Sequence, residues 1–283
     1  MASPPFTARP GRDAGSAVES APRAHDADTW NTVAIEWQAH RAEIWRAHSD
    51  AVYASLLDRW LPRKGLDRIL KTDLFDEAVS GGLYPVLAAR AGRVIGIDVA
   101  HVMARQAVER HAAIGAAGAD VRSLPFADGT FDAVVSLSTL DHFAAAADLE
   151  AGIAELGRVL CQGGTLILTL DNLANPLIRL RNFLPFALVH GAGLVPYFVG
   201  ETCTPRAAAA LVGAHGFRVD ELTTVLHVPR VAAVPAAALV GRRAGAGARD
   251  RFLLHLRAWE RLAGWPTRAL TGHYVAIRAT RLA

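Results

Sequence analysis

An aspartate, Asp98, closes an apolar segment of the chain, where its carboxylate could bind polar groups of a ligand. Asp98 ends the run Val-Ile-Gly-Ile at 94–97, and Asp120 stands shortly before a Leu-Pro-Phe stretch at 124–126. A carboxylate at the end of a buried strand can accept both hydroxyls of a ribose, as in nucleotide-binding α/β folds. For Asp98 the alternative is a helix cap, because a helix is expected from His101 onward.

A second group of charges lies in a loop that follows the first expected strand, 68–70. Lys71, Asp73 and Asp76 fall within six positions, and no glycine occurs before Gly81. At the carboxyl end of a buried strand, such residues could bind a ligand that carries an ammonium and a carboxylate. The alternative is a salt-bridged surface loop whose ligand binding is weak or lost.

The segment 139–143 carries candidates for acid–base chemistry. His142 could take a proton from a hydroxyl nucleophile, and Asp141 could orient its ring or cap the next helix. The alternative for His142 is a packed structural residue, because group transfer that depends on alignment needs little acid–base help.

Two polar turns follow later strands. The turn 171–176 holds Asn172 and Asn175, which could bind a substrate or fix the turn, and His227 and Arg230 flank a proline in the second. For His227 and Arg230 a loop-fixing role is favoured over the binding of an acidic group.

Composition narrows the class of protein. The chain has 283 residues, a formal net charge of +3 and two cysteines, Cys161 and Cys203. Two cysteines cannot form a disulfide framework and suit a reducing, cytoplasmic location, and neither has a Cys or His at metal-ligand spacing, so no metal site is expected. The positive charge is spread out, which disfavours nucleic acid as a partner.

The pattern of apolar residues predicts three regions. Residues 1–28, rich in Ala, Pro, Ser and Arg, are expected to be a disordered tail without a signal peptide or anchor. Apolar residues at helical spacing from Trp30 to Leu56 predict a helical cap over 29–62. The main domain, 63–283, is expected to hold everything else.

Strands and helices alternate through the first part of this main domain. Strands are expected at 68–70, 93–98, 131–137 and 165–170, and helices at 84–91, 102–117 and 149–160. Such alternation requires a parallel sheet covered on both faces, whose ligands bind at the carboxyl ends of the strands. The expected cleft is therefore lined by 71–76, 98–99, 120–124 and 136–142.

The last third differs in composition. The stretch 176–203 is largely apolar but contains prolines and glycines, so it is expected to be an irregular insertion that could cover an acceptor site. Strands are expected at 217–227 and 273–282, with helices at 231–240 and 252–262 between them.

The stretch Leu-Pro-Phe-Ala-Asp-Gly-Thr-Phe-Asp-Ala-Val-Val-Ser at 124–136, with Asp98 upstream, resembles the middle of the class I S-adenosylmethionine-dependent methyltransferases. The resemblance implies an α/β fold, with a Rossmann-like seven-stranded, mostly parallel sheet, helices on both faces and an antiparallel last strand. It also implies S-adenosyl-L-methionine as the cofactor. Family members usually have an acidic residue and alternating glycines after the first strand. Here Lys71 stands at the position of the acidic residue, and Asp73 stands at the position of the first glycine.

The resemblance assigns roles to particular residues. Asp98 and Val99 would bind the ribose, Asp120 and Val121 the adenine, and Ser136 would lie below the methionine part. Asp141 and His142 correspond to a segment beside the methyl-accepting site in the family. The expected cofactor-binding residues are Lys71, Asp73, Asp98, Val99, Asp120, Val121, Leu124 and Ser136, and the expected catalytic residues are His142 and Asp141.

The sequence therefore predicts a methyltransferase that acts on a small, largely apolar metabolite or a lipid. A membrane span is not expected, because His190 and the prolines Pro185 and Pro196 interrupt a short apolar stretch, whereas peripheral contact with a membrane stays open. The alternative is a non-catalytic protein of the same fold that serves in binding or as a scaffold. An NAD(P)-dependent oxidoreductase ranks last, because the glycine-rich fingerprint is missing after the first strand.

Overall fold

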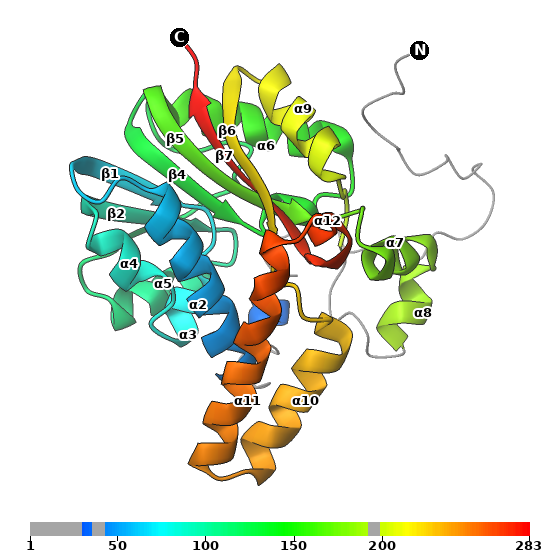
Figure 1. Ribbon diagram of the computed structural model, residues 1–283. Coiled ribbons are helices and arrows are strands. Elements are labelled where there is room, and N and C mark those ends of the chain that lie inside the picture. The colour runs from blue at the N-terminus through cyan, green and yellow to red at the C-terminus, as the bar shows by residue number, and fades with distance from the viewer. Residues whose placement is uncertain (1–29, 36–42, 192–198) are drawn as a thin grey trace, which may run out of the picture.

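A computed structural model describes residues 30–35, 43–191 and 199–283 (Figure 1). Its centre is a seven-stranded sheet in the order β3-β2-β1-β4-β5-β7-β6. β7 runs antiparallel to both of its neighbours and the other pairs are parallel, which confirms the expected Rossmann-like sheet. The strands are β1 Leu66–Lys71, β2 Ala91–Asp98, β3 Gly115–Gly118, β4 Phe131–Leu137, β5 Leu160–Asp171, β6 Phe217–Val225 and β7 Tyr274–Arg281.

Helices cover both faces of the sheet, and the alternation of side chains along each strand divides the core between them. On β4, Val134 belongs to the cluster that includes α6 and α9, whereas Ala133 and Val135 pack with α2, α4 and α5. Burial of both faces explains the apolar run 133–135 within this strand. The helices on these faces are α2 Glu43–Trp60, α3 Phe75–Val79, α4 Tyr84–Ala88, α5 His101–Arg110, α6 Ala146–Val159 and α9 Pro205–Ala214.

The remaining helices lie beyond the carboxyl ends of the strands. α10 and α11 form a hairpin between β6 and β7 that extends away from the sheet at the bottom of Figure 1. Ala237 of α10 and Leu256 of α11 pack against Ile44 and Trp45 of α2, so the hairpin is anchored on that helix. The elements are η1 Leu140–His142, α7 Pro176–Phe183, α8 Phe186–Gly191, α10 Arg230–Arg243, α11 Ala246–Ala258, η2 Trp259–Gly264 and α12 Arg268–Thr271.

The expected helix over 102–117 is wrong in its second half. α5 ends at Arg110, and 115–118 form strand β3. The sequence Gly-Ala-Ala-Gly has neither the β-branched residues nor the alternation that signal a strand. It forms one because β3 is an edge strand with a single partner, β2, and Gly118 leaves room for the ring of His101, which a Cβ there would overlap.

The stretch 176–203 is more regular than expected. It contains α7 and α8, which are separated at Leu184 and Pro185. Asn175 caps α7 by accepting a hydrogen bond from the backbone N–H of Leu177, and Pro176 occupies the first turn, so both start signals are present in the sequence. The expectations for 1–28 and for 192–198 lie outside the described residues.

Three properties of the described residues bear on function. No helix among them is long and apolar enough to span a membrane. No group of three or more His, Cys, Asp or Glu residues in the same ranges could hold a metal ion. Both cysteines are free thiols.

The loop after β1 is packed by side chains. Leu74 is fully buried, and its side chain occupies the space beside Gly96 of β2, where a Cβ would overlap it. Glu77 fills the corresponding space beside Gly82, where a Cβ would come within 2.6 Å of the Glu77 carboxylate. The two glycines, Gly96 and Gly82, therefore lie opposite the side chains of Leu74 and Glu77, and the loop that follows β1 contains no glycine before Gly81.

The substitution Gly96→Ala is expected to destabilise the fold by about 1–3 kcal/mol, because the buried Leu74 has little space to move. Gly213→Ala on α9 is the matched control, since a Cβ there meets nothing within 4 Å. It should be neutral or stabilise by up to about 1 kcal/mol. Urea unfolding followed by circular dichroism measures both, and equal stability of the two variants would contradict the packing described here.

Candidate active site

The residues expected to bind a ligand lie where the carboxyl ends of β1, β2 and β4 meet. Thr72, directly after β1, donates a hydrogen bond from Oγ1 to Ser136 Oγ of β4 at 3.0 Å, and its Oγ1 also lies 3.0 Å from Thr139 Oγ1. Ser136 is fully buried. These hydroxyls join the ends of two neighbouring strands at the floor of the site.

Asp98 connects the loops after β1 and β2. Its carboxylate accepts hydrogen bonds from the backbone N–H of Leu74 at 3.1 Å and of Ala100 at 2.7 Å. Burial, together with the charge of Asp73, raises the pKa of Asp98 to about 7. The bond to Ala100 is a local turn before α5, whose N-cap residue Ala100 has no side-chain cap, so Asp98 does not cap this helix. Its carboxylate retains further acceptor positions for a ligand.

The charged loop after β1 has a buried part and an exposed part, since the side chain of Asp73 is 38% exposed. Lys71 is 4% exposed, and its Nζ lies 2.8 Å from Oε2 of Glu77, which is fully buried. Lys71 also donates to the backbone carbonyl of Asp73, and Glu77 accepts from the backbone N–H of Leu83 at 2.9 Å. Burial opposes ionisation of Lys71, but the carboxylates of Glu77 and Asp73 raise its pKa above the ordinary value.

Acidic groups outnumber Lys71 around this loop. Burial, with the charge of Glu77, raises the pKa of Asp50 on α2 to about 6, and burial, with the charge of Asp50, raises that of Asp76 to about 7. Carboxyl groups stay protonated up to such pH values when their removal from water and their mutual repulsion outweigh their attraction to a cation. The site therefore has an excess of negative charge that a positively charged ligand would stabilise.

Asp120 lies close to Asp98 but is already bound to a cation. The backbone N–H of Ala119 donates to the carbonyl of Asp98 at 3.1 Å, which brings the two loops together. The Asp120 carboxylate accepts from Arg122 Nη2 at 2.6 Å and Nε at 3.0 Å, and Arg122 also pairs with Asp148 at 2.6 Å. A ligand at Asp120 would share the carboxylate with this guanidinium.

The apolar residues expected near the adenine belong largely to the core. Val121 and Leu124 are buried among the side chains that α6 packs on, and the ring of Phe126 meets that of Phe131 edge to face at 5.0 Å. Val99 is half-buried at the end of β2.

The expected catalytic pair lies in η1, after β4. Ser138 has a φ of +52°, a strained conformation for a residue with a side chain, and its hydroxyl donates to the Asp141 carboxylate at 3.1 Å. Asp141 is 1% exposed, and its burial raises its pKa to about 6. The ring of His142 lies 4.9 Å from that of Trp30, so the N-terminal segment 30–35 reaches over this part of the site.

A further polar cluster, which the sequence did not reveal, lies at the ends of β5 and β7. Asp171 is 2% exposed and pairs with Arg181 of α7 at 2.6 Å and with His273 at 3.6 Å. Burial opposes ionisation of Asp171, but Arg181 and His273 hold its pKa below the usual range. Burial lowers the pKa of His273 to about 3. The sequence places Asp171 in a polar turn, but nothing in the sequence indicates that it pairs with Arg181 and His273.

Arg230 and Tyr274 extend this polar cluster. Arg230 Nη1 donates to the Tyr274 hydroxyl at 2.7 Å, and its guanidinium lies 5.9 Å from the centre of the Trp45 ring. Asn172, Asn175 and His227 instead fix loops. Both asparagines donate to the carbonyl of Gly272, at 2.9 Å and 3.1 Å, and His227 contacts Thr271 Oγ1 at 2.7 Å.

Comparison with known proteins agrees with this arrangement. Residues 76–168 match the model of a methyltransferase domain. This match, which covers about a third of the chain, supports the resemblance to the class I S-adenosylmethionine-dependent methyltransferases, whose cofactor is S-adenosyl-L-methionine.

Solved structures of the same fold support the assignment of the architecture. A chain of the Haloferax volcanii complex between the Trm112 methyltransferase activator and a methyltransferase has 17% identity and a TM-score of 0.58, with 92% of this chain and 99% of that chain covered. A methyltransferase from Methanosarcina mazei has 17% identity and a TM-score of 0.54, with 80% of this chain and 97% of that chain covered. Geranyl diphosphate C-methyltransferase from Streptomyces coelicolor has 16% identity and a TM-score of 0.53, with 82% of this chain and 79% of that chain covered.

The substitution Asp171→Asn is expected to cost about 3 kcal/mol of stability, because it leaves the Arg181 guanidinium without its counter-charge in a largely buried position. Glu221→Gln is the control, since Glu221 pairs with Arg278 at 3.5 Å and is half exposed. Its loss should cost less than about 1 kcal/mol. Urea unfolding at neutral pH compares the two, and a similar cost for both would show that Asp171 is not the centre of a buried ion pair.

Proposed function

We propose that the protein transfers a methyl group from S-adenosyl-L-methionine to a small, largely apolar acceptor such as a lipid or an apolar metabolite. The observation that carries the proposal is the carboxylate-rich end of β1 and β2 within a domain that matches the methyltransferase model. When bound, the cofactor supplies an electrophilic methyl group on a positively charged sulfur.

The side chains at the ends of β1 and β2 fit the charges of this cofactor. Asp98 has acceptor positions left for ribose hydroxyls after its two backbone bonds, and Asp120 can accept from the adenine amino group beside Arg122. Lys71 has three N–H donors. Two of them go to Glu77 and to the Asp73 carbonyl, which leaves one for the carboxylate of the methionine part. The excess of carboxylates around Asp76 suits its ammonium and sulfonium groups.

The N-terminal segment 30–35 would shield this site from water. Its Trp30 ring lies against His142, and the side chain of Asn31 accepts from the backbone N–H of Val102, at the start of α5, at 3.3 Å. Ala34 is buried beside Ala78 and Ala100. The segment therefore contacts both the cofactor half and η1, and exclusion of water strengthens the electrostatic interactions below it.

His142 and Asp141 would act at the acceptor. His142 would take a proton from a hydroxyl or amine nucleophile, and Asp141 would stabilise the charged ring by its electrostatic interaction with His142. Alignment of the nucleophile with the methyl group would supply most of the rate enhancement.

The apolar character of the acceptor is inferred from α7 and α8. Four large apolar residues on these two short helices are exposed: Leu177 by 49%, Leu180 by 56%, Phe183 by 84% and Leu188 by 64%. Exposed apolar side chains gathered in one region commonly mark a binding surface. They follow the Asp171 cluster in the chain, so an apolar acceptor bound there could reach the cleft from this side.

The second candidate is a non-catalytic binding or scaffold protein. It is favoured by the loop after β1, where Asp73 stands at the position of the first glycine in other family members, and where Leu74 and Glu77 fill the space beside Gly96 and Gly82. Isothermal titration with S-adenosyl-L-methionine and its demethylated product distinguishes the two, because the absence of binding to the full chain favours the scaffold.

Asp98→Asn and Asp120→Asn are each expected to weaken cofactor binding by about 1–3 kcal/mol, since each leaves polar groups of the ligand with a poorer partner. Asp67→Asn, at the exposed amino end of β1, is the matched control and should bind as the parent does. Unchanged affinity of both site variants, with the fold intact by circular dichroism, would refute the proposed cofactor site.

Cofactor affinity is expected to rise as the pH increases through about 7. Asp76 and Asp98 have pKa values raised to about 7, so below that pH they are protonated and no longer attract a cation. The Asp98→Asn variant should show a shallower dependence. Isothermal titration from pH 6 to pH 8.5 measures how the cofactor affinity changes with pH, and a change of one pKa unit corresponds to about 1.4 kcal/mol of binding free energy. An affinity that falls with rising pH would contradict this charge assignment.

The combined substitution Leu180→Ser and Phe183→Ser is expected to lower methyl transfer to an apolar acceptor by about tenfold, the value of roughly 1.4 kcal/mol of lost burial, while cofactor affinity stays unchanged. Extracts incubated with the protein and methyl-labelled cofactor supply the acceptor. Label that appears in water-soluble sugars or in protein, and not in the organic phase, would refute the apolar acceptor.

A further inference from the structure

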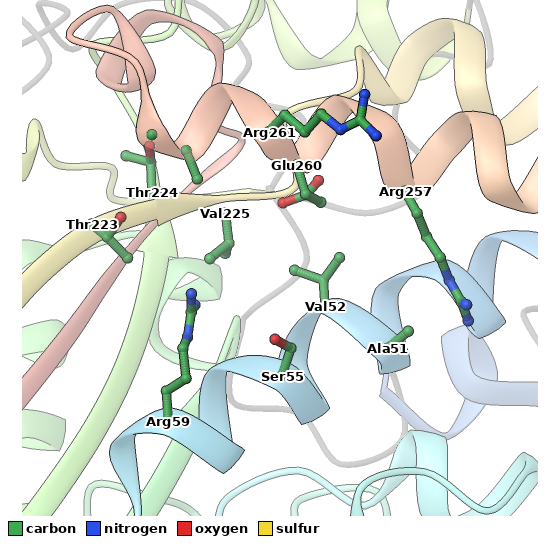
Figure 2. A pocket seen from close by; sticks show the side chains of 12 residues that line it. Ala51, Val52, Ser55, Arg59, Thr223, Thr224, Val225, Arg257, Glu260 and Arg261 are labelled. Carbon is green, nitrogen blue, oxygen red and sulfur yellow. The ribbon is translucent and has the colours of Figure 1, made fainter.

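A cavity of about 670 Å³ lies away from the cleft, between α2, the last residues of β6, and the junction of α11 with η2 (Figure 2). β6 is the edge strand of the sheet, and α2 packs nearer the sheet's middle, against β1 and β7 residues. The space between α2 and this edge is therefore left open. None of the residues assigned to the methyltransferase site lines it.

The cavity is lined by three arginines: Arg59 of α2, Arg257 of α11 and Arg261 of η2. Within the part of the chain that the structure describes, none of the three side chains forms an ion pair or a hydrogen bond. By contrast, Arg122, Arg158 and Arg181 each pair with a carboxylate at 2.6–2.7 Å. The guanidinium groups at the cavity thus retain their full set of donors for a ligand.

One acidic residue, Glu260, also lines the cavity. Its carboxylate accepts hydrogen bonds from the backbone N–H groups of Leu226 at 3.2 Å and His227 at 2.9 Å. Burial raises its pKa above the ordinary value. The neighbouring His48 is neutral near pH 7, because burial and the charge of Arg257 lower its pKa to about 4. One carboxylate bound to backbone donors does not balance the guanidinium groups of Arg59 and Arg257 that flank the space.

The arrangement of the side chains suits a ligand held at its centre. Figure 2 shows Arg59 extending from α2 toward β6, and Arg257 extending from α11 toward α2 on the other side, so that the two flank the space above Ser55. Arg261 extends away from α2. Val52 and Val225 supply an apolar wall between the two arginines, and Thr223 adds a hydroxyl.

We infer that this cavity binds a small phosphorylated molecule with an apolar body. Arginine binds phosphate with two parallel N–H donors, and hydroxyls complete such sites. The volume falls in the range of roughly 300–1,000 Å³ that small-molecule sites occupy. A concave site of this size does not suit a nucleic acid strand, which binds along an extended basic surface.

Octyl phosphate is the probe for this site, with octanol as the uncharged counterpart and inorganic phosphate as the competitor. The full chain is expected to bind octyl phosphate in isothermal titration at least about tenfold more tightly than octanol, the value of one charge-assisted hydrogen bond. Inorganic phosphate should compete. Arg59→Gln and Arg257→Gln should each weaken binding of octyl phosphate by about tenfold, and Arg59→Lys should lose less because it keeps the charge.

Arg206→Gln is the matched control, because Arg206 is an exposed arginine of α9 on the opposite face of the sheet. It should bind octyl phosphate as the parent does. Affinity for S-adenosyl-L-methionine should be unchanged in every variant, so a failure of this inference is distinguishable from a failure of the proposed function. The inference is overturned if octyl phosphate does not bind, or if the Gln variants at 59 and 257 bind it as tightly as the Arg206→Gln control.

Discussion

The ion pair between Lys71 and Glu77 is the interaction on which the site depends. Both side chains are almost fully removed from water, and that removal is tolerated only where the partners are fixed and the remaining donors and acceptors are satisfied. Glu77 also accepts from the N–H of Leu83, and Lys71 donates to the carbonyl of Asp73. The pair thereby joins the end of β1 to α3 and to the start of α4. The loop is positioned by its side chains in place of glycine, and Asp98 is in turn positioned by the N–H of Leu74 in that loop.

Electrostatics divides the carboxyl edge of the sheet into two halves. Around Asp50, Asp76 and Asp98 the carboxyls are too close and too buried to be fully ionised, so this half attracts cations. Around Asp171 the guanidinium groups of Arg181 and Arg230 balance the buried carboxylate, so this half has no such excess of negative charge. Similar folds support many reactions, so the fold by itself does not define the acceptor.

The parts of the fold that the sequence predicts are those whose signals are local. β4 and β5 are apolar runs bounded by turn residues, and Asp98 is recognised because it directly follows such a run. β3 is missed because a short edge strand of glycine and alanine is specified by its neighbour β2. The charge of Lys71 is visible, but its burial against Glu77 depends on how α3 folds back over β1. Arg59 and Arg257 come from opposite ends of the chain, so only the packing of α11 on α2 brings them to one cavity.

The contact between Trp30 and His142 has a consequence for the order of events during turnover. Segment 30–35 lies across the ends of β1, β2 and β4, and its contacts include the Trp30 ring against η1, the hydrogen bond between Asn31 and the start of α5, and the packing of Ala34 on Ala78 and Ala100. A short segment can open locally at a lower free energy than global unfolding. Under the proposed function, exchange of the cofactor would require this opening, whereas an acceptor would reach His142 by a second route, beside α7 and α8. A molecule that reaches Trp30 by this second route and packs on it would keep segment 30–35 closed. The two ligands would then leave in sequence, and the slower departure would set the turnover rate.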